Sequence, residues 1–286
     1  MSQNYSKKMI KVPSYTLLRE QDQGKMPVLD VRNLGIDFGG LTAVDGFNIT
    51  IGPTEISGLI GPNGAGKTTI FNLLTSVYQP TRGSILIKGI DTKGMTTAKV
   101  NRMGIARTFQ NIRLFDNMSA LDNVKVGMHN SIKCSFLSSL LRLPSYYKAE
   151  KAANKKAMEL LDFMGLADVA DAKAGSLPYG VQRRLEIVRA LATDPAIILL
   201  DEPAAGMNPS ETTELMHQIR RIRDTFQIAI FLIEHDMNLV MNVCEAIAVV
   251  NYGRIIAKGT PEQIREDPAV IEAYLGRKDV DGNAEN

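Results

Sequence analysis

The amino-acid sequence predicts an α/β fold in which helices cover both faces of a mostly parallel sheet. Short apolar runs of strand length alternate along the chain with segments of helical periodicity. Three of these runs, at residues 55–60, 196–200 and 228–233, are almost continuously apolar, which is typical of parallel strands buried on both faces. Elements in this order favour a wound sheet with helices on either side.

The composition supports a globular protein and excludes several other classes. The 286 residues carry 33 basic and 31 acidic side chains, so the net charge of +2 is too small to indicate nucleic-acid binding. No run approaches the roughly 18 apolar residues of a membrane span, and polar residues stand where a signal peptide has its apolar stretch. Cys134 and Cys244 are the only cysteines, which argues against a disulfide framework or a cysteine metal site. We expect a soluble, cytoplasmic protein.

The first half of the chain begins with a polar, aperiodic segment, residues 1–27, which we interpret as a flexible lead-in. Alternating apolar and polar residues then predict strands near residues 26–31 and 43–51, and the second of these strands stops at Gly52-Pro53. The run at 55–60 leads directly into Gly61-Pro62-Asn63-Gly64. A helical pattern follows Lys67.

Helix-forming residues dominate the middle of the chain, from residue 118 to residue 166. Strands return at 196–200, 228–233 and 246–250. Between the first two of these we expect a helix over residues 209–225, with Pro209 in its first turn, where a missing N–H does no harm.

The loop between the strand at 55–60 and the next helix predicts a phosphate-binding site. It reads Gly61-Pro62-Asn63-Gly64-Ala65-Gly66-Lys67-Thr68 and is followed by Thr69, which fits the pattern G-x-x-x-x-G-K-[ST] in its required setting. Glycines let successive N–H groups point at phosphate oxygens, and the helix adds its positive end. Lys67 would contact the β- and γ-phosphates of a nucleotide, and the Thr68 hydroxyl would bind Mg²⁺. The alternative is an ordinary glycine-rich turn with a surface lysine, which the order strand, loop, helix disfavours.

Acidic residues at the end of a later strand supply the metal carboxylate that such a loop needs. The run at 196–200 ends in Asp201-Glu202, where Asp201 would hold Mg²⁺ and Glu202 would polarise a water in line with the γ-phosphate. His235 follows the strand at 228–233 and would sense the γ-phosphate from the same sheet edge. Alone, an acidic strand end is as often structural as functional, and a single histidine is usually structural or simply solvated. Together with the phosphate loop, these residues predict ATP hydrolysis.

A segment before the Asp-Glu strand resembles one particular family of ATPases. Residues 177–191, which begin Leu-Pro-Tyr-Gly and contain Gly180, Arg183 and Arg184, resemble the signature segment of ATP-binding cassette proteins. Residues 107–110, Arg-Thr-Phe-Gln, resemble the Q-loop of that family, and residues 204–208 resemble its D-loop. The resemblance covers residues 28–276 and is nearest to the longer of the two paired ATP-binding subunits of branched-chain amino acid importers. This finer assignment is carried by residues 107–115, the Leu-Pro-Tyr-Gly signature, residues 233–237 and residues 259–264, and also by the closing Ala-Tyr-Leu-Gly at 273–276.

The resemblance implies a P-loop NTPase fold with an antiparallel N-terminal β subdomain, a parallel core and a helical subdomain. The helical subdomain would span about residues 111–190 and contain a long helical insertion at 131–156. A C-terminal family motif would span about 259–276, and residues 277–286 would form a flexible tail. It also implies site roles: Gln110 as a magnesium and coupling residue, Phe38 as the aromatic that stacks on adenine, and Gly180 as a contact to nucleotide. A phenylalanine at the position of Phe38 is otherwise most often core.

Two positions depart from the wider family. Pro178 and Val181 stand where the usual signature has Ser and Gln, and a proline offers neither a hydroxyl nor an N–H to a phosphate. Gly180 and the helix after it would still approach the nucleotide of a partner subunit. Asn208 stands where many D-loops have Asp.

The partners implied by the resemblance are integral-membrane permease subunits and a second cassette, either the paired shorter subunit or an identical copy. A solute-binding protein would act indirectly, and nucleic acid is not expected as a partner. ATP and Mg²⁺ would be held between the phosphate loop of one cassette and the signature segment of the other, at the cytoplasmic face of the membrane. Residues 111–115, next to Gln110, would contact a helix of the permease. From their spacing alone, an ordinary packed joint between a strand and a helix is an equally good interpretation. Alternatives are an ATPase of lipopolysaccharide export, and a non-transport cassette that acts on ribosomes or DNA.

Overall fold

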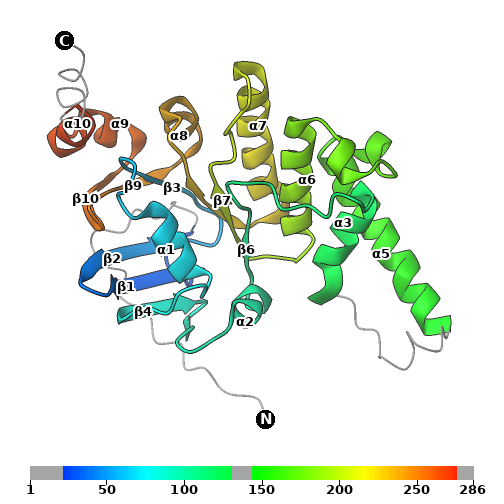
Figure 1. The fold of residues 1–286 in the computed structure, drawn as a ribbon, viewed down its shortest axis with the longest axis horizontal. Helices are drawn as coiled ribbons and strands as arrows, with labels where there is room; N and C mark the ends of the chain where they lie inside the picture. Colours follow the sequence, from blue (N-terminus) through cyan, green and yellow to red (C-terminus); the bar gives the residue numbers. More distant parts are fainter. Residues whose placement is uncertain (1–21, 131–143, 276–286) are drawn as a thin grey trace.

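A computed structural model describes residues 22–130 and 144–275 of the chain, and these contain two β-sheets (Figure 1). The smaller sheet is antiparallel and has the order β2-β1-β4-β5. Its strands are β1 (Leu29–Phe38), β2 (Leu41–Ile51), β4 (Arg82–Ile87) and β5 (Ile90–Asp91). The predicted strand at 43–51 is thus one arm of a hairpin, and the strand near 26–31 extends further than predicted.

The larger sheet has six strands in the order β10-β9-β3-β8-β7-β6. All neighbouring pairs are parallel except β10 with β9, as expected for a wound core. Its strands are β3 (Ile56–Ile60), β6 (Ile105–Arg107), β7 (Ile197–Asp201), β8 (Ala229–Ile233), β9 (Ala246–Asn251) and β10 (Arg254–Gly259).

Helices cover both faces of the larger sheet and form one end of the molecule. In Figure 1, α3 and α5 lie at the opposite end from α9 and α10. The α-helices are α1 (Lys67–Leu74), α2 (Thr97–Arg102), α3 (Ala120–Gly127), α5 (Pro144–Phe163), α6 (Tyr179–Leu191), α7 (Pro209–Phe226), α8 (Met237–Val243), α9 (Pro261–Glu266) and α10 (Pro268–Leu275). None of them is long and apolar enough to span a bilayer.

Alternate residues of the central strands pack into two different cores, which explains why their sequences are continuously apolar. On β7, Ile197 and Leu199 face a core shared with α1 and the antiparallel sheet. Ile198 and Leu200 face a second core, shared with α6, α7 and α8. Strand β8 alternates in the same way. Helix α1, which begins at the phosphate loop, is therefore fixed between the two sheets.

The packed part of the chain begins before residue 28, so the expected lead-in is too long at its C-terminal end. Asp22 is fully buried, and its carboxylate accepts hydrogen bonds from the Thr54 amide, at 2.8 Å, and from the Thr54 hydroxyl. Sequence periodicity misses this contact because a single buried polar residue leaves no pattern. Of the insertion expected at 131–156, residues 131–143 lie outside the described residues, and the remainder forms the first part of α5. The expected tail at 277–286 also lies outside them.

Candidate functional site

The predicted phosphate loop connects β3 to α1, and close backbone contacts fix its course. Gly61 has φ +152°, and a Cβ at this position would lie 2.0 Å from the carbonyl oxygen of Val250, so only glycine fits. Gly66 is the N-cap of α1 and has φ +101°, in the left-handed region. The Lys67 ammonium folds back on the loop and donates to the carbonyls of Gly61, at 2.6 Å, and Pro62, at 3.0 Å.

The outer side of the loop faces solvent. Asn63, Gly64 and Thr68 are exposed, whereas Ala65 and Lys67 are buried. The α1 backbone amides at this end have no intrahelical acceptors and are suited to an anion. The arrangement can bind phosphate oxygens with backbone N–H groups and an ammonium, with the Thr68 hydroxyl beside them.

Strand β7 ends in the predicted metal carboxylate, Asp201, which is 3% exposed. Its Oδ2 accepts a hydrogen bond from the Arg107 guanidinium at 2.7 Å. Its backbone N–H lies 3.3 Å from the Thr108 hydroxyl, so β6 and β7 are joined here by side chains as well as by strand pairing. The carboxylate therefore has a fixed position at the carboxyl edge of the sheet.

Glu202, His235 and Gln110 meet at the same edge. Glu202 has φ +48°, and its carboxylate Oε2 accepts from the Gln110 amide at 2.9 Å and lies 3.8 Å from His235 Nδ1. The His235 side chain is 64% exposed, so it is open to a ligand. The amide of Gln110 lies on Glu202 and not on Asp201, which differs from the metal position that the resemblance implied for it. A carboxylate flanked by an amide and an imidazole can hold and deprotonate a water.

Glu234 fixes the two loops that carry Glu202 and His235. It is 1% exposed, and its carboxylate accepts hydrogen bonds from the backbone amides of Ala204, His235 and Asp236. Burial raises the pKa of Glu234, and the three N–H donors oppose that shift. The residue ties the loop after β7 to the loop after β8. Its position directly after an apolar strand was the only sequence signal for it.

Phe38 ends β1 as an exposed aromatic residue. The ring is 44% exposed and makes an edge-to-face contact with Tyr78, at 5.2 Å between centroids. This is not the buried environment of a core phenylalanine, so the core interpretation of Phe38 is disfavoured. A ring supported on one edge and open to solvent can stack on a nucleobase.

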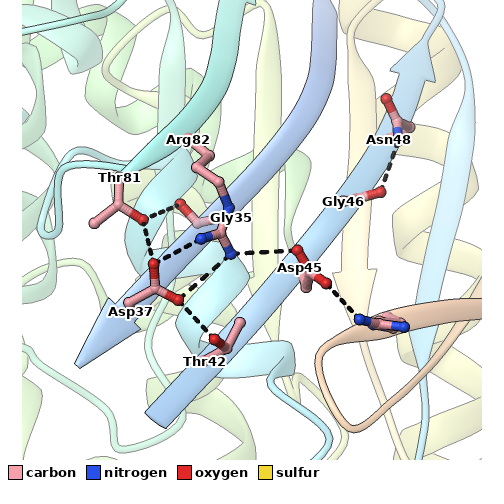
Figure 2. A network of polar contacts seen from close by, with 9 residues as sticks. Gly35, Asp37, Thr42, Asp45, Gly46, Asn48, Thr81 and Arg82 are labelled. Atoms are coloured by element: carbon pink, nitrogen blue, oxygen red, sulfur yellow. Dashed lines mark hydrogen bonds and ion pairs between the residues drawn. The ribbon is translucent and has the colours of Figure 1, made fainter. Parts of the chain in front are cut away.

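A polar network holds the end of the strand that carries Phe38 (Figure 2). Asp37 accepts from Thr42 at 2.7 Å and from Arg82 at 2.7 Å, and Arg82 also reaches Asp45. Asp45 in turn accepts from Arg254 of β10 at 2.7 Å, which joins the two sheets. The Thr42 hydrogen bond and the Arg82 guanidinium lower the pKa of Asp37.

Replacing Phe38 with alanine is expected to weaken ATP binding about tenfold, because a base–aromatic stack contributes roughly 1–3 kcal/mol. Turnover at saturating ATP should change less than twofold, because the groups around the γ-phosphate are untouched. Titration calorimetry and a phosphate-release assay measure the two quantities. Tyr252→Ala, which removes an 87% exposed ring from the β9–β10 turn, is the control. An unchanged ATP affinity in Phe38→Ala would remove Phe38 from the base site.

The signature segment forms the start of α6, with Pro178 as an N-cap that makes no side-chain cap. Gly180 lies near the Glu211 carboxylate, so a Cβ there would be 3.1 Å from Oε1. Its contact to the nucleotide of a partner subunit stays a prediction.

Arg183 of the same helix has an internal role that sequence reasoning missed. It is fully buried and donates to the carbonyls of Phe109, at 2.6 Å, and Gln110, at 2.7 Å. Glu186 pairs with Arg183 at 3.0 Å and accepts from the amides of Phe109 and Arg113. The resemblance places Arg183 in the signature segment, which is expected to face the nucleotide of a second subunit. In the structure its guanidinium instead binds the Q-loop backbone of its own chain.

The residues at this edge suit Mg²⁺ bound together with phosphate. In the described part of the chain, no group of three or more His, Cys, Asp or Glu side chains is arranged to hold a metal ion. One buried carboxylate, Asp201, and one exposed hydroxyl, Thr68, are hard oxygen donors of the kind that bind Mg²⁺ when a nucleotide supplies further oxygens. The donor set therefore fits Mg²⁺ and does not fit a soft metal.

Two segments from the C-terminal part of the chain are placed toward the phosphate loop. Tyr274 of α10 is half-buried against the core; burial raises the pKa of its hydroxyl, and the Gly61 backbone amide opposes that shift. The β9–β10 turn makes a second contact, from the Gly253 amide to the Ala65 carbonyl at 2.9 Å.

Comparisons with known proteins agree with this geometry. Residues 44–205 match the family model described as ABC transporter, and residues 254–280 match the model of the branched-chain amino acid ATP-binding cassette transporter. The chain is 49% identical over 250 residues to the high-affinity branched-chain amino acid transport ATP-binding protein LivG of Escherichia coli. It is 47% identical to the corresponding protein BraF of Pseudomonas aeruginosa. Each match covers 87% of this chain and 98% of the relative.

Solved structures match the fold as well. A nucleotide-free ATP-binding cassette from an ABC transporter superimposes with a TM-score of 0.76 and 32% identity, over 87% of this chain and 99% of that chain. The ADP conformation of such a cassette gives the same TM-score and identity over 88% of this chain. The predicted fold class and the predicted resemblance are thereby confirmed. With its phosphate loop, its Asp-Glu strand end and these relatives, the chain belongs to the ABC transporter family, as one of its ATP-binding cassettes.

Proposed function

We propose that this chain is the ATP-binding and ATP-hydrolysing subunit of a membrane importer of branched-chain amino acids or related small polar solutes. The observation that carries the chemistry is the meeting of Glu202, Gln110 and His235 at the sheet edge that also carries the phosphate loop. The solute class is supported by the C-terminal match at residues 254–280 and by the names of the relatives.

In this proposal Lys67 and the α1 amides bind the phosphates of ATP, and Phe38 stacks on the base. Asp201 and Thr68 would hold Mg²⁺, which would supply positive charge to the phosphate oxygens. Glu202 accepts a proton from the attacking water, and His235 contacts the γ-phosphate from the neighbouring loop. Glu234 keeps Glu202 and His235 in register, because it binds both loops.

A second cassette completes the site in the proposal. Gly180, at the start of α6, would contact ATP bound to the partner, and the partner's phosphate loop would reciprocate. Arg183 of α6 donates a hydrogen bond to the Gln110 carbonyl. A movement of the signature segment would therefore move Gln110 of the same chain. ATP would close the pair of cassettes, and hydrolysis would open it.

A groove of about 260 Å³ between the core and the helical subdomain suits a helix of a membrane partner. Its rim carries exposed apolar side chains from Phe115 and from Val126, which is 41% exposed. Arg189 lines the groove and lies 5.8 Å from the Phe115 ring, and its neighbour Glu186 is already paired with Arg183. A short helix with apolar residues and a carboxylate would complement this surface. We assign it to the permease, so the chain would work at the cytoplasmic face of the membrane.

Replacing Val126 with aspartate is expected to reduce recovery of membrane subunits at least fivefold, because a charge enters an apolar contact. ATP binding by the isolated chain should be unchanged. The measurement is co-purification from native membranes, with membrane subunits quantified by mass spectrometry. Ile90→Asp places the same charge on an exposed apolar position of β5, outside the groove, and should retain the partners. Full recovery with Val126→Asp would show that the groove is not the docking site.

The function itself is tested by affinity purification of the tagged chain from its own cells in mild detergent. Two multi-span membrane proteins and a second, shorter cassette protein are the expected partners. Uptake of radiolabelled leucine should fall in a strain that lacks the chain. Ribosomal or DNA-bound partners without any membrane protein would contradict the transport role and leave only the ATPase chemistry.

A further inference from the structure

Arg107 is a buried arginine at the last position of β6, where the chain leaves the sheet toward Gln110. Its side chain is 7% exposed, and that of its ion-pair partner Asp201 is 5% exposed. Burying a guanidinium is costly unless its donors are paired. Both Nη groups of Arg107 are paired, whereas its buried Nε has no hydrogen-bond partner among the described residues. Arg107 also lines the groove that we assign to the permease, but the chemistry described above gives it no role.

The guanidinium joins three elements of the site. Nη2 donates to Asp201 Oδ2 on β7 at 2.7 Å. Nη1 donates to the side-chain oxygen of Asn72 on α1 at 2.7 Å, and lies 3.4 Å from the Thr75 hydroxyl. Because α1 begins at the phosphate loop and β6 leads to the Q-loop, one side chain ties both loops to the metal carboxylate.

Only one oxygen of Asp201 is used in this contact. Among the described residues, the second carboxylate oxygen, Oδ1, accepts no hydrogen bond, so it remains an available acceptor. A carboxylate with one oxygen fixed by a cation cannot rotate freely, which is the property that a metal ligand needs. The planar fork of arginine can bind Asp201 and Asn72 together, whereas a lysine ammonium is a single point of charge.

Aromatic rings hold the guanidinium in place. Its carbon lies 5.6 Å from the centre of the Phe71 ring and 5.3 Å from that of Phe109. Because two rings lie nearby and both Nη1 and Nη2 donate hydrogen bonds, the Arg107 side chain has a fixed position in the site.

We propose that Arg107 is the positioning residue of the magnesium site: it orients Asp201 toward the metal and keeps β7, α1 and the Q-loop strand in register. The inference rests on the proposed function, because it assumes that ATP binds here with Mg²⁺. It predicts that Arg107 acts on the magnesium-dependent part of nucleotide affinity, and not on the contacts of the phosphate loop.

The test measures the ATP dissociation constant of the purified chain in Mg²⁺ and in EDTA, by titration calorimetry. Arg107→Gln is expected to reduce the affinity gained from Mg²⁺ about tenfold, with the EDTA value within twofold of the wild type. Arg107→Lys, which keeps the charge but not the fork, should lose about threefold. Asn72→Ala, which cuts the same guanidinium from α1, should lose two- to threefold.

A matched control is Arg32→Gln, which breaks the Arg32–Asp30 pair on β1, away from the site, and should leave both constants unchanged. An unchanged or enlarged magnesium gain in folded Arg107→Gln would overturn the inference. If Arg107→Gln does not fold, the test uses Asn72→Ala instead. An unchanged magnesium-dependent gain in ATP affinity in Asn72→Ala would then overturn the inference. A wild-type chain that binds no ATP would instead contradict the proposed function, so the two failures are distinguishable.

Discussion

Replacing Glu202 with glutamine is expected to lower ATP turnover by about 10²–10⁴-fold, the usual contribution of a general base. ATP affinity should stay within twofold, because Lys67 and the α1 amides bind the phosphates and Glu202 acts only on the attacking water. The Glu202 carboxylate accepts a hydrogen bond from Gln110 at 2.9 Å and lies 3.8 Å from His235 Nδ1. It is therefore placed to accept a proton from a water held beside these two side chains. A carboxamide of the same size cannot take a proton from water. Phosphate release measures turnover, and titration calorimetry measures affinity.

The same variant should also prolong the ATP-bound pair of cassettes, because hydrolysis is the step that would release it. Size-exclusion chromatography with ATP and Mg²⁺ would then show a dimer that the wild type loses on incubation. Glu159→Gln, at a 63% exposed position of α5, controls for the loss of one carboxylate. Turnover at the wild-type rate in folded Glu202→Gln would exclude Glu202 as the base.

Lys67, Asp201 and His235 could be placed in one site from the sequence, because each follows a recognisable strand and because parallel strands end at one edge of a sheet. The strands before Lys67, Asp201 and His235 were recognisable by their apolar residues. Strands β3, β8 and β7 are parallel neighbours, so their carboxyl ends share one edge. The edge rule for open α/β sheets therefore brings the three residues together before any coordinates are known.

The part that could not be predicted consists of contacts between residues far apart in the chain. Arg107 pairs with Asp201 across 94 positions, and Arg183 binds Gln110 across 73. The periodicity and the motifs around these two arginines do not show whether the side chains are buried and paired or exposed at the surface. The signature segment therefore predicts no internal contact for Arg183, and the Q-loop motif predicts no role for Arg107. The hydrogen bond of Gln110 to Glu202 was missed for the same reason.

These contacts describe how the Q-loop connects the site to the rest of the cassette. Arg107 fixes its incoming strand to Asp201 and α1, and Arg183 fixes its backbone at Phe109 and Gln110 to the signature helix. The Phe109 ring lies near both Arg107 and Arg113. A segment held at both ends by buried cations moves with the elements that hold it, so a shift of α6 would displace Gln110 relative to Glu202.

Replacing Lys67 with alanine is expected to weaken ATP binding at least a hundredfold and to reduce turnover below detection. A charge-assisted hydrogen bond contributes roughly 1.5–3 kcal/mol, and the ammonium would make more than one to the β- and γ-phosphates. The side chain is now folded onto the Gly61 and Pro62 carbonyls, so the variant also loses contacts that shape the loop. Calorimetry with ATP and Mg²⁺ gives the affinity, and thermal unfolding shows whether the chain is folded.

Two controls separate the loss of a phosphate contact from the loss of loop shape. Lys67→Met keeps the length of the side chain without its charge and should bind ATP as poorly as Lys67→Ala, because it is the charge that the phosphates require. Lys155→Ala removes an 80% exposed lysine from α5 and should bind normally. If Lys67→Met retained wild-type affinity, packing of the side chain and not its charge would hold the loop. The phosphate-binding role of Lys67 would then be wrong.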